Sequence, residues 1–292
     1  MSNNISVIIP TYNSSLYIVR TLDSVLSQSC LPHEIVIVDD GSTDNTIEII
    51  EDYKKNNESI FDNIRLYKQK NMGAGAARNR AILEAKGQWI AFLDSDDIWL
   101  PTKLEEVEKV INNSPQISII AHDEFAVNDK KMDKRRLCNL HELFNESKDL
   151  FLQLYEGNIF STSCMVIKKD VIERAGGFDV SLRSAQDYDL WIRCSIYGKL
   201  VYIPKALEIY VTRDGNISAN IYRRYVCEMN ICHKYIGELT ERIGVNRAQA
   251  IVRQRIFNIH KVEAYLALKQ RKFSVFAKIM LRLIPEIIKG VK

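Results

Sequence analysis

The sequence lacks a long apolar run, because no stretch reaches the roughly 18 to 20 apolar residues that a membrane-spanning helix needs. The N-terminal segment MSNNISVIIPTYN has no basic region ahead of its short apolar stretch, so we expect no signal peptide. The six cysteines include no C-x-x-C pair. This argues against a zinc ribbon or a disulfide framework and favours reduced thiols in a cytoplasmic protein.

The chain also has little net charge. A charge of +3 over 292 residues is too small for a typical nucleic-acid-binding protein, so we expect no nucleic-acid partner. The total hides an uneven distribution, because residues 253–292 contain ten Lys or Arg and only two Asp or Glu. A hydrophobic fraction of 46% is sufficient for a core, and the length allows one large domain or two ordinary ones.

Apolar, β-rich segments alternate with helical patterns in the first third of the chain. The predicted strands are 5–10, 34–40, 64–69 and 88–94, and the predicted helices are 16–28, 45–54 and 74–85. The apolar face of the first helix is predicted at Leu16, Val19, Leu22, Val25 and Leu26. This order implies an α/β fold with a mostly parallel sheet, in which ligands bind beyond the carboxyl ends of the strands. Beyond about residue 220 we predict only helix.

Three carboxylates, Asp94, Asp96 and Asp97, follow the fourth predicted strand. Asp94 and Asp96 are two residues apart, so they point the same way if the strand persists. Carboxylates this close repel one another unless a positive group is present. A divalent cation on a diphosphate would supply that charge, since Mg²⁺ and Mn²⁺ prefer oxygen ligands. The alternative is a solvated turn in which Asp97 caps the following helix.

Two further segments carry candidate binding residues. Asp39 and Asp40 end the second predicted strand at an Asp-Gly pair, which is also ordinary turn chemistry. The segment NMGAGAARNR, residues 71–80, has Arg78 where a dinucleotide-binding fingerprint requires glycine. Its glycines would still let the backbone approach a ligand, and Arg78 could bind phosphate with two N–H groups.

Asp187 and Asp189 lie near the start of the helix predicted in GGFDVSLRSAQDYDLWIR, residues 176–193. The helix dipole favours negative charge there, so capping is a fair explanation of Asp189. For Asp187 we favour a catalytic role, as a general base that acts on a hydroxyl opposite the metal and phosphate.

Four blocks in this order resemble the family 2 glycosyltransferases with the GT-A fold. They are SVIIPTYN (6–13), VDDGSTDNT (38–46), NMGAGAARNRAILEAKGQWIAFLDSDD (71–97) and GGFD…QDYDLW (176–191). The resemblance covers residues 5 to about 220. It implies a GT-A catalytic domain over residues 1–220, followed by a helical, basic extension over residues 221–292.

The resemblance also implies a role for each matching residue. Pro10, Tyr12, Asp39 and Asp40 would line the uridine pocket, and Arg78 would help to hold the nucleotide. Asp94, Asp96 and Asp97 would form the D-x-D element, with one carboxylate on the ribose and Asp96 or Asp97 on Mn²⁺ or Mg²⁺. Asp187 would be the general base of an inverting displacement on a UDP-sugar.

The sequence departs from the family pattern at two places. Gln186 stands where Glu is common, which bears on acceptor contacts or on the pKa of the base. The segment YVTRDGNIS, residues 210–218, contains Arg213 but not the late His that some members use as a metal ligand. His122 is a candidate substitute, although a single His near a strand is usually structural.

The segment 271–292 places Phe273, Phe276, Met280, Leu283 and Ile287 at steps of three and four residues, with Lys278, Arg282 and Lys289 between them. We expect an amphipathic helix on an anionic membrane surface. The alternative is a helix docked on the catalytic domain, and Pro285 argues against one straight helix. Membrane binding fits family members that extend polyprenyl-diphosphate-linked sugars on the inner face of the cell membrane, in O-antigen or capsule synthesis.

Two other classes of function make different predictions. A sugar nucleotidyltransferase would carry a G-x-G-x-R-type loop after the first strand, and PTYNSS is not one. A non-catalytic sugar- or lipid-binding descendant would have lost Asp187 or the acidic cluster, and both are present. The sequence therefore favours a transferase whose donor sugar and acceptor it does not identify.

Overall fold

The computed structural model describes residues 4–213 and 220–289, without the side chains of His141 and of residues 284–289. The strands are β1 (Ile5–Thr11), β2 (Glu34–Asp39), β3 (Ile64–Lys68), β4 (Trp89–Phe92), β5 (Ile98–Trp99), β6 (Ile119–Asn128), β7 (Lys131–Cys138), β8 (Val166–Lys168) and β9 (Leu200–Thr212). The helices before residue 200 are α1 (Ile18–Leu26), α2 (Thr46–Asn57), α3 (Ala74–Glu84), α4 (Lys103–Asn113), α5 (Leu150–Glu156), α6 (Lys169–Arg174) and α7 (Gln186–Tyr197), with short 3₁₀ turns at Leu140–Glu142 and Thr162–Cys164.

The described strands form one mixed sheet in the order β3-β2-β1-β4-β8-β6-β9-β5, and β7 pairs with β6 outside this path. β1 runs parallel to both β2 and β4, with Thr11 opposite Asp39 and Ile8 opposite Phe92. β8 is antiparallel to β4 and β6, whereas β6 and β9 are parallel. The carboxyl ends of β1, β2 and β4 therefore meet at one edge, as predicted for a mostly parallel α/β sheet.

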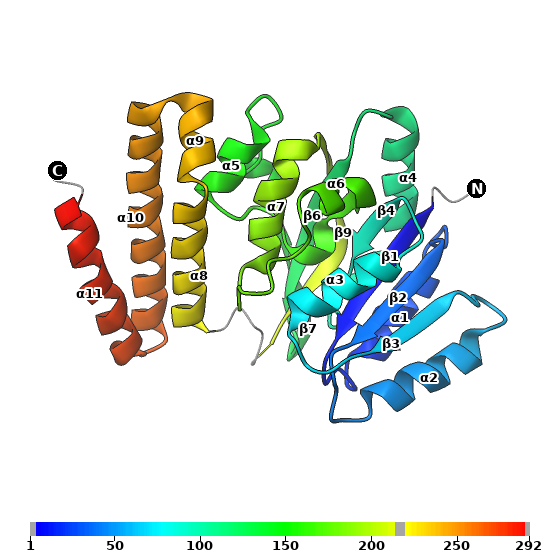
Figure 1. Ribbon diagram of the computed structural model, residues 1–292. Helices are drawn as coiled ribbons and strands as arrows, with labels where there is room; N and C mark the ends of the chain where they lie inside the picture. The colour runs from blue at the N-terminus through cyan, green and yellow to red at the C-terminus, as the bar shows by residue number, and fades with distance from the viewer. Residues whose placement is uncertain (1–3, 214–219, 290–292) are drawn as a thin grey trace.

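The continuous apolar segments of the sequence become the centre of this sheet. All residues of β1, β2 and β4 are buried, since helices cover both faces of a parallel sheet. In Figure 1, α3 and α6 lie over the face of the sheet that is turned to the viewer. Within the larger of the two main apolar clusters, Phe92 of β4 packs edge-on against Trp191 of α7, with ring centroids 5.2 Å apart.

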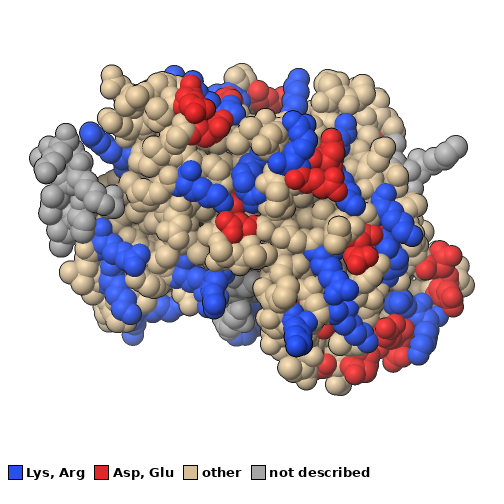
Figure 2. Space-filling model, viewed as in Figure 1, with Lys and Arg blue, Asp and Glu red and all other residues tan. Residues whose placement is uncertain are grey.

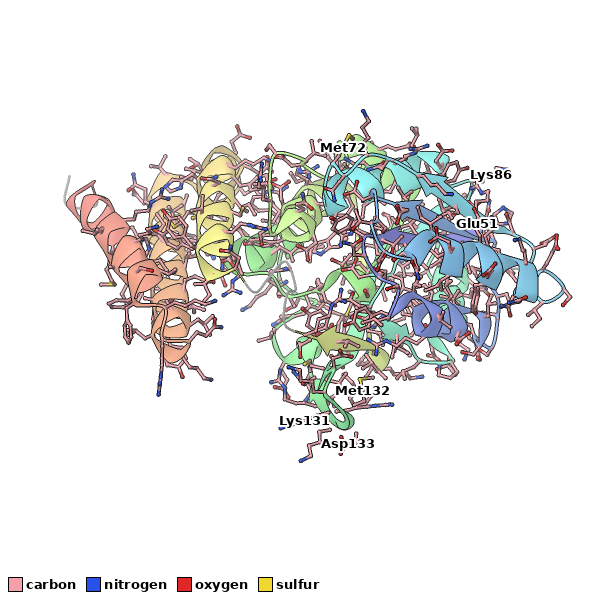
Figure 3. The ribbon with its side chains drawn as sticks, turned by 90° about the horizontal axis from the view of Figure 1, so that it is seen from below. Glu51, Met72, Lys86, Lys131, Met132 and Asp133 are labelled. Carbon is pink, nitrogen blue, oxygen red and sulfur yellow. The ribbon has the colours of Figure 1, made fainter. Side chains whose placement is uncertain are left out.

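The structure differs from the predicted elements in two places. Leu22 and Val25 of α1 are buried as predicted, but Leu16 and Val19 are 82% and 41% exposed, and Ile18 is buried in their place. A step of three or four residues before Leu22 fits Val19 and Ile18 equally, so periodicity alone did not separate them. Residues 131–138, for which no element was predicted, form β7, and the tip of the β6–β7 hairpin at Lys131–Asp133 projects from the body in Figure 3.

In the described part of the chain after residue 220 the helices are α8 (Ile221–Lys234), α9 (Ile236–Ile243), α10 (Val245–Lys269) and α11 (Phe273–Lys289). In Figure 1, α9 lies beyond the end of α8, α10 runs beside both, and α11 lies on the far side of α10 from the sheet. Their buried residues, among them Tyr225 of α8 and Ile279 of α11, belong to the same apolar cluster as the core around Phe92. No helix in the described ranges has the length and apolarity needed to cross a bilayer.

The prediction for residues 271–292 is met in part. One helix, α11, runs through Pro285, contrary to the expectation that this proline would interrupt it. Its inner side packs on α10, with Ile279 fully buried, while Phe273 is 65% exposed. The side chains of Pro285, Ile287 and Lys289 lie outside the described residues. The helix therefore docks on its neighbours along one side and presents a second side to the surroundings.

Candidate active site

A cavity of about 770 Å³ lies beyond the carboxyl ends of β1 and β4. It is lined by residues from every predicted block and also from α8. The predicted site residues that line it are Pro10, Tyr12, Asp40, Arg78, Asp94, Asp96, Asp97 and Asp187. Asp39 is not among the lining residues.

The two acids after β2 have different surroundings. Asp39 is fully buried and accepts hydrogen bonds from Gly41 N–H at 3.1 Å, Ser42 N–H at 2.9 Å and the Ser42 hydroxyl at 2.5 Å, so it shapes its own turn. Asp40 accepts from the N–H groups of Met72 at 2.9 Å and Gly73 at 2.7 Å. Of the pair, Asp40 is thus the one at the cavity, where it fixes the loop between β3 and α3.

Asp94 is paired with an arginine of α3. The Arg78 guanidinium donates to Asp94 Oδ1 at 2.6 Å and lies over the Phe178 ring, 5.3 Å from its centroid. Arg78 is almost fully buried, and the neighbouring Asp94 carboxylate raises its pKa against the opposing effect of burial. The ion pair and the ring contact together hold the predicted guanidinium at the cavity wall.

Asp96 and Asp97 both line the cavity but have different partners. Asp96 Oδ2 accepts from Arg213 Nη2 at 2.9 Å. Asp97 is only 2% exposed, and it accepts from Val211 N–H at 2.9 Å and from the Ser163 hydroxyl at 2.6 Å. Burial and the nearby Asp96 carboxylate raise the Asp97 pKa well above its usual range. Asp94 and Asp96 are therefore the more exposed acids at the cavity, whereas Asp97 is held by β9 and Ser163.

Asp187 lines the same cavity from the first turn of α7. The Thr162 hydroxyl donates to its Oδ2 at 3.3 Å. Burial raises the Asp187 pKa, and the positive charge of Arg78 counteracts part of this rise. A carboxylate with a raised pKa, held at a cavity wall, is suited to accept a proton near neutral pH.

Gln186, the residue that departs from the family pattern, faces Gly75 of α3. A Cβ atom on Gly75 would lie 2.8 Å from Gln186 Nε2, so the amide occupies the space that the glycine leaves. Gln186 Nε2 also donates to the Leu182 carbonyl at 2.5 Å. An uncharged amide packs between α3 and α7 here, beside the candidate base.

Three residues of α8 line the same cavity: Arg223, Arg224 and Glu228. Glu228 pairs with Arg255 of α10 at 3.2 Å, and Arg224 pairs with Glu263 of α10 at 2.7 Å. These three residues were not predicted, because a helical pattern shows which face is apolar but not which cavity that helix borders. The segment from residue 221 on thus contributes directly to the site.

His122 does not line the cavity. Its ring is fully buried, and Nδ1 lies 2.7 Å from the Asp123 carbonyl oxygen. Burial and the nearby Lys103 ammonium lower its pKa well below the usual range. The structural explanation of His122 fits these contacts, and the suggestion that it replaces a metal-ligating histidine at this cavity does not.

A sheet with a parallel half, and acids and arginines at its carboxyl edge, define a nucleotide-diphospho-sugar transferase of the GT-A type. A model of glycosyl transferase family 2 matches residues 6–176. The chain is 33% identical over 224 residues to the putative teichuronic acid biosynthesis glycosyltransferase TuaG of Bacillus subtilis, covering 75% of this chain and 83% of that protein. It is 32% identical to an uncharacterized glycosyltransferase of Nostoc, covering 82% and 76%. The chain therefore belongs to glycosyl transferase family 2.

Solved structures of low sequence identity share the fold. S. aureus TarS, residues 1–349, in complex with UDP-GlcNAc superposes with a TM-score of 0.69 at 22% identity, covering 88% of this chain and 72% of that one. A mannosyltransferase from Pyrobaculum calidifontis, solved with GDP-Man and Mn²⁺, superposes with a TM-score of 0.61 at 19% identity, covering 99% and 87%. Both likenesses support the GT-A fold, and the second shows a divalent metal in one protein of this fold.

Proposed function

We propose that this glycosyltransferase moves a hexose, glucose or galactose, from a UDP-sugar to a hydroxyl of a saccharide acceptor. One observation carries this proposal: a single cavity brings together Asp40, Arg78, Asp94 and Asp187. The first three belong to the blocks that the family resemblance assigns to the nucleotide. The fourth is a carboxylate beside the space left for an acceptor.

We assign the nucleotide to the lining residues that follow β1, β2 and β4 and to Arg78 of α3. Asp40 accepts from the uracil N–H, and Pro10 and the half-exposed Tyr12 border the base. Arg78 and Asp94 hold the ribose and phosphate region as a pair. Asp39 shapes the turn behind Asp40 instead of meeting the nucleotide itself.

The reaction is an inverting single displacement. Asp187 removes the proton from the acceptor hydroxyl, whose oxygen then attacks the anomeric carbon from the face opposite UDP. The bond between that carbon and the diphosphate oxygen breaks, and its electron pair remains on UDP. A UDP-α-sugar would give a β-linked product.

The predicted cofactor, Mn²⁺ or Mg²⁺, rests on Asp96 and Asp97. Asp97 lines the cavity but is only 2% exposed, and hydrogen bonds from Ser163 and Val211 hold it, so it offers a metal ion little free surface. Asp96 faces the cavity, but its carboxylate is paired with Arg213. With these pairings intact, the described residues fit a divalent cation poorly.

The acceptor side is formed by α7 and α8. Arg223, Arg224 and Glu228 border the cavity where an incoming saccharide would approach Asp187. Relatives named for teichuronic acid biosynthesis and for chondroitin synthesis support a role in cell-surface polysaccharide assembly, such as O-antigen or capsule. A polyprenyl-diphosphate-linked acceptor on the inner face of the cell membrane fits the basic surface of α10 and α11.

The proposal is tested with the purified protein and a panel of UDP-sugars, using a polyprenyl-diphosphate N-acetylhexosamine acceptor. We expect transfer from one UDP-hexose and a β-linked product by NMR. Asp187→Asn should bind UDP with nearly unchanged affinity in calorimetry and lose turnover by about 10³-fold or more. An active Asp187→Asn variant would require another base, and absence of UDP binding by the wild-type protein would refute the donor assignment.

A further inference from the structure

The carboxylates at the end of β4 already have positive partners in the protein. Asp94 Oδ1 binds Arg78 at 2.6 Å, and Asp96 Oδ2 binds Arg213 at 2.9 Å. The Arg20 guanidinium also donates to the Asp96 carbonyl oxygen, at 3.3 Å. Guanidinium groups therefore offset part of the crowding of acids, although burial and the Asp94 carboxylate still raise the Asp96 pKa.

Arg213 is held firmly in this position. It follows the last residue of β9, and its guanidinium lies over the Tyr17 ring, 4.2 Å from the centroid. Arg20 lies over the same ring at 4.9 Å. The side chain of Arg213 is 24% exposed, and the residue lines the cavity beside Asp96. A guanidinium stacked on an aromatic ring and paired with a carboxylate is pre-organised for an anionic ligand.

A divalent cation on Asp96 would have to share this space with Arg213. A dication and a guanidinium a few ångströms apart repel each other, so metal binding requires the Arg213–Asp96 pair to open. Asp97 offers no alternative, because its hydrogen bonds with Ser163 and Val211 would also have to break. The divalent cation and the Arg213 guanidinium are thus alternatives beside Asp96, and the protein itself supplies the guanidinium.

We infer that Arg213 takes the place of the divalent cation, so that this chain binds UDP and transfers its sugar without a metal. The inference rests on the proposed function and deepens it. When the bond between the anomeric carbon and the diphosphate oxygen breaks, the Arg213 guanidinium donates to the departing phosphate oxygens, and the acceptor proton goes to Asp187. A planar guanidinium matches phosphate with paired N–H donors, and such fixed donors stabilise the charge that develops in the transition state.

Three variants separate this role from a structural one. Arg213→His removes the fixed positive charge and offers a metal ligand beside Asp96. Arg213→Lys keeps the positive charge but lacks the paired N–H donors of the guanidinium. Arg183→His is the matched control, because Arg183 is exposed near α7 and does not line the cavity. Thermal unfolding of each variant checks that the fold is intact.

The experiment measures UDP binding by calorimetry and transfer by product formation, each with EDTA and with Mn²⁺, together with Mn²⁺ binding by EPR in the presence of UDP. We expect wild-type binding and rate to be unchanged by EDTA within about twofold, and no protein-bound Mn²⁺ signal. Arg213→His should lose about 10²–10³-fold in rate with EDTA. Mn²⁺ should restore part of that loss and give a bound EPR signal. Arg213→Lys should retain part of the metal-free rate, and Arg183→His should behave as the wild type.

Two outcomes would overturn the inference alone: UDP binding by the wild type only when Mn²⁺ is present, or an Arg213→His variant as active in EDTA as the wild type. Failure to bind UDP under either condition would instead refute the proposed donor. The two failures are therefore distinguishable.

Discussion

Asp189 of α7 accepts a hydrogen bond from the ammonium of Lys234, the last residue of α8, at 2.8 Å. The same carboxylate, fully buried, also accepts from the Tyr235 hydroxyl at 2.7 Å and from Arg193 at 2.7 Å. It lies two residues after the candidate base. Asp189 thus binds the end of α8 to α7, two residues after Asp187. These contacts, more than capping of α7, define the role of Asp189.

Asp189→Asn should destabilise the protein by about 3 kcal/mol, because it removes one charge from a buried network and leaves Arg193 without its partner. Asp179→Asn is the matched control, since Asp179 binds the same Lys234 at 3.1 Å but is partly exposed. The loss there should stay below about 1 kcal/mol. Urea unfolding measures both values, and equal losses in the two variants would contradict the assigned role of Asp189.

The pH dependence of turnover should report the surroundings of Asp187. The base must be deprotonated, so the rate falls as the pH drops through its pKa. Burial raises that pKa, which places the acidic limb above the ordinary aspartate value of 3.8. The Arg78 charge lowers the same pKa, so Arg78→Met should move the limb to higher pH, while Arg78→Lys should move it less.

The measurement is kcat against pH at saturating donor. Arg80→Met is the control, because Arg80 lies on the same helix but does not line the cavity. A limb that stays in place in Arg78→Met would show that Asp187 is not the group that titrates.

The sequence predicted best the part of the fold that contains continuous apolar strands. β1, β2 and β4 are buried throughout, and their composition leaves no alternative to a central position in the sheet. β7, with the sequence KMDKRRLC, escaped prediction because most of its residues are exposed and it has no regular apolar alternation. It is a strand because it pairs with β6, which is a tertiary cause.

The candidate site was predictable where its residues lie in a recognisable block. Asp40 and Asp94 could be named because they follow strands, and Asp187 because it lies at the start of a helix in such a block, and each lines the cavity. Arg213 and Glu228 could not, since their positions depend on pairings between segments far apart in the chain, with Asp96 and with Arg255. The different partners of Asp96 and Asp97 likewise follow from contacts with β9 and Ser163, not from local spacing.

Glu228 should affect the acceptor and not the donor. It lines the cavity from α8, and burial raises its pKa while Arg255 opposes the rise. Loss of a hydrogen bond from a charged partner costs about 1.5–3 kcal/mol, so Glu228→Gln should raise the acceptor KM about tenfold or more. Its dissociation constant for UDP should not change.

The control is Glu241→Gln, an exposed residue of α9 that does not line the cavity. An unchanged acceptor KM in Glu228→Gln, or an equal loss of UDP affinity, would remove α8 from the acceptor site.

The outer side of α10 and α11 combines exposed apolar and basic side chains. Tyr265, Phe273 and Leu281 are more than half exposed. Patches of Lys and Arg side chains lie over these helices on the face shown in Figure 2, and the exposed bases of the two helices include Lys269 and Lys278. This combination is typical of a helix pair that rests on an anionic membrane, where each lysine near the surface contributes about 1 kcal/mol.

We therefore expect the protein to sediment with vesicles that contain phosphatidylserine and not with neutral vesicles. Lys269→Glu together with Lys278→Glu should reduce binding by more than about tenfold, since each lysine contributes about 1 kcal/mol. Lys54→Glu with Lys55→Glu reverses the same number of charges on α2, which lies at the other end of the molecule from α11 (Figure 1), and should leave binding nearly unchanged. An equal reduction in both double variants would mean that overall charge, and not this surface, attracts the membrane. Wild-type protein that stays in the supernatant would leave α10 and α11 as helices docked on the catalytic part.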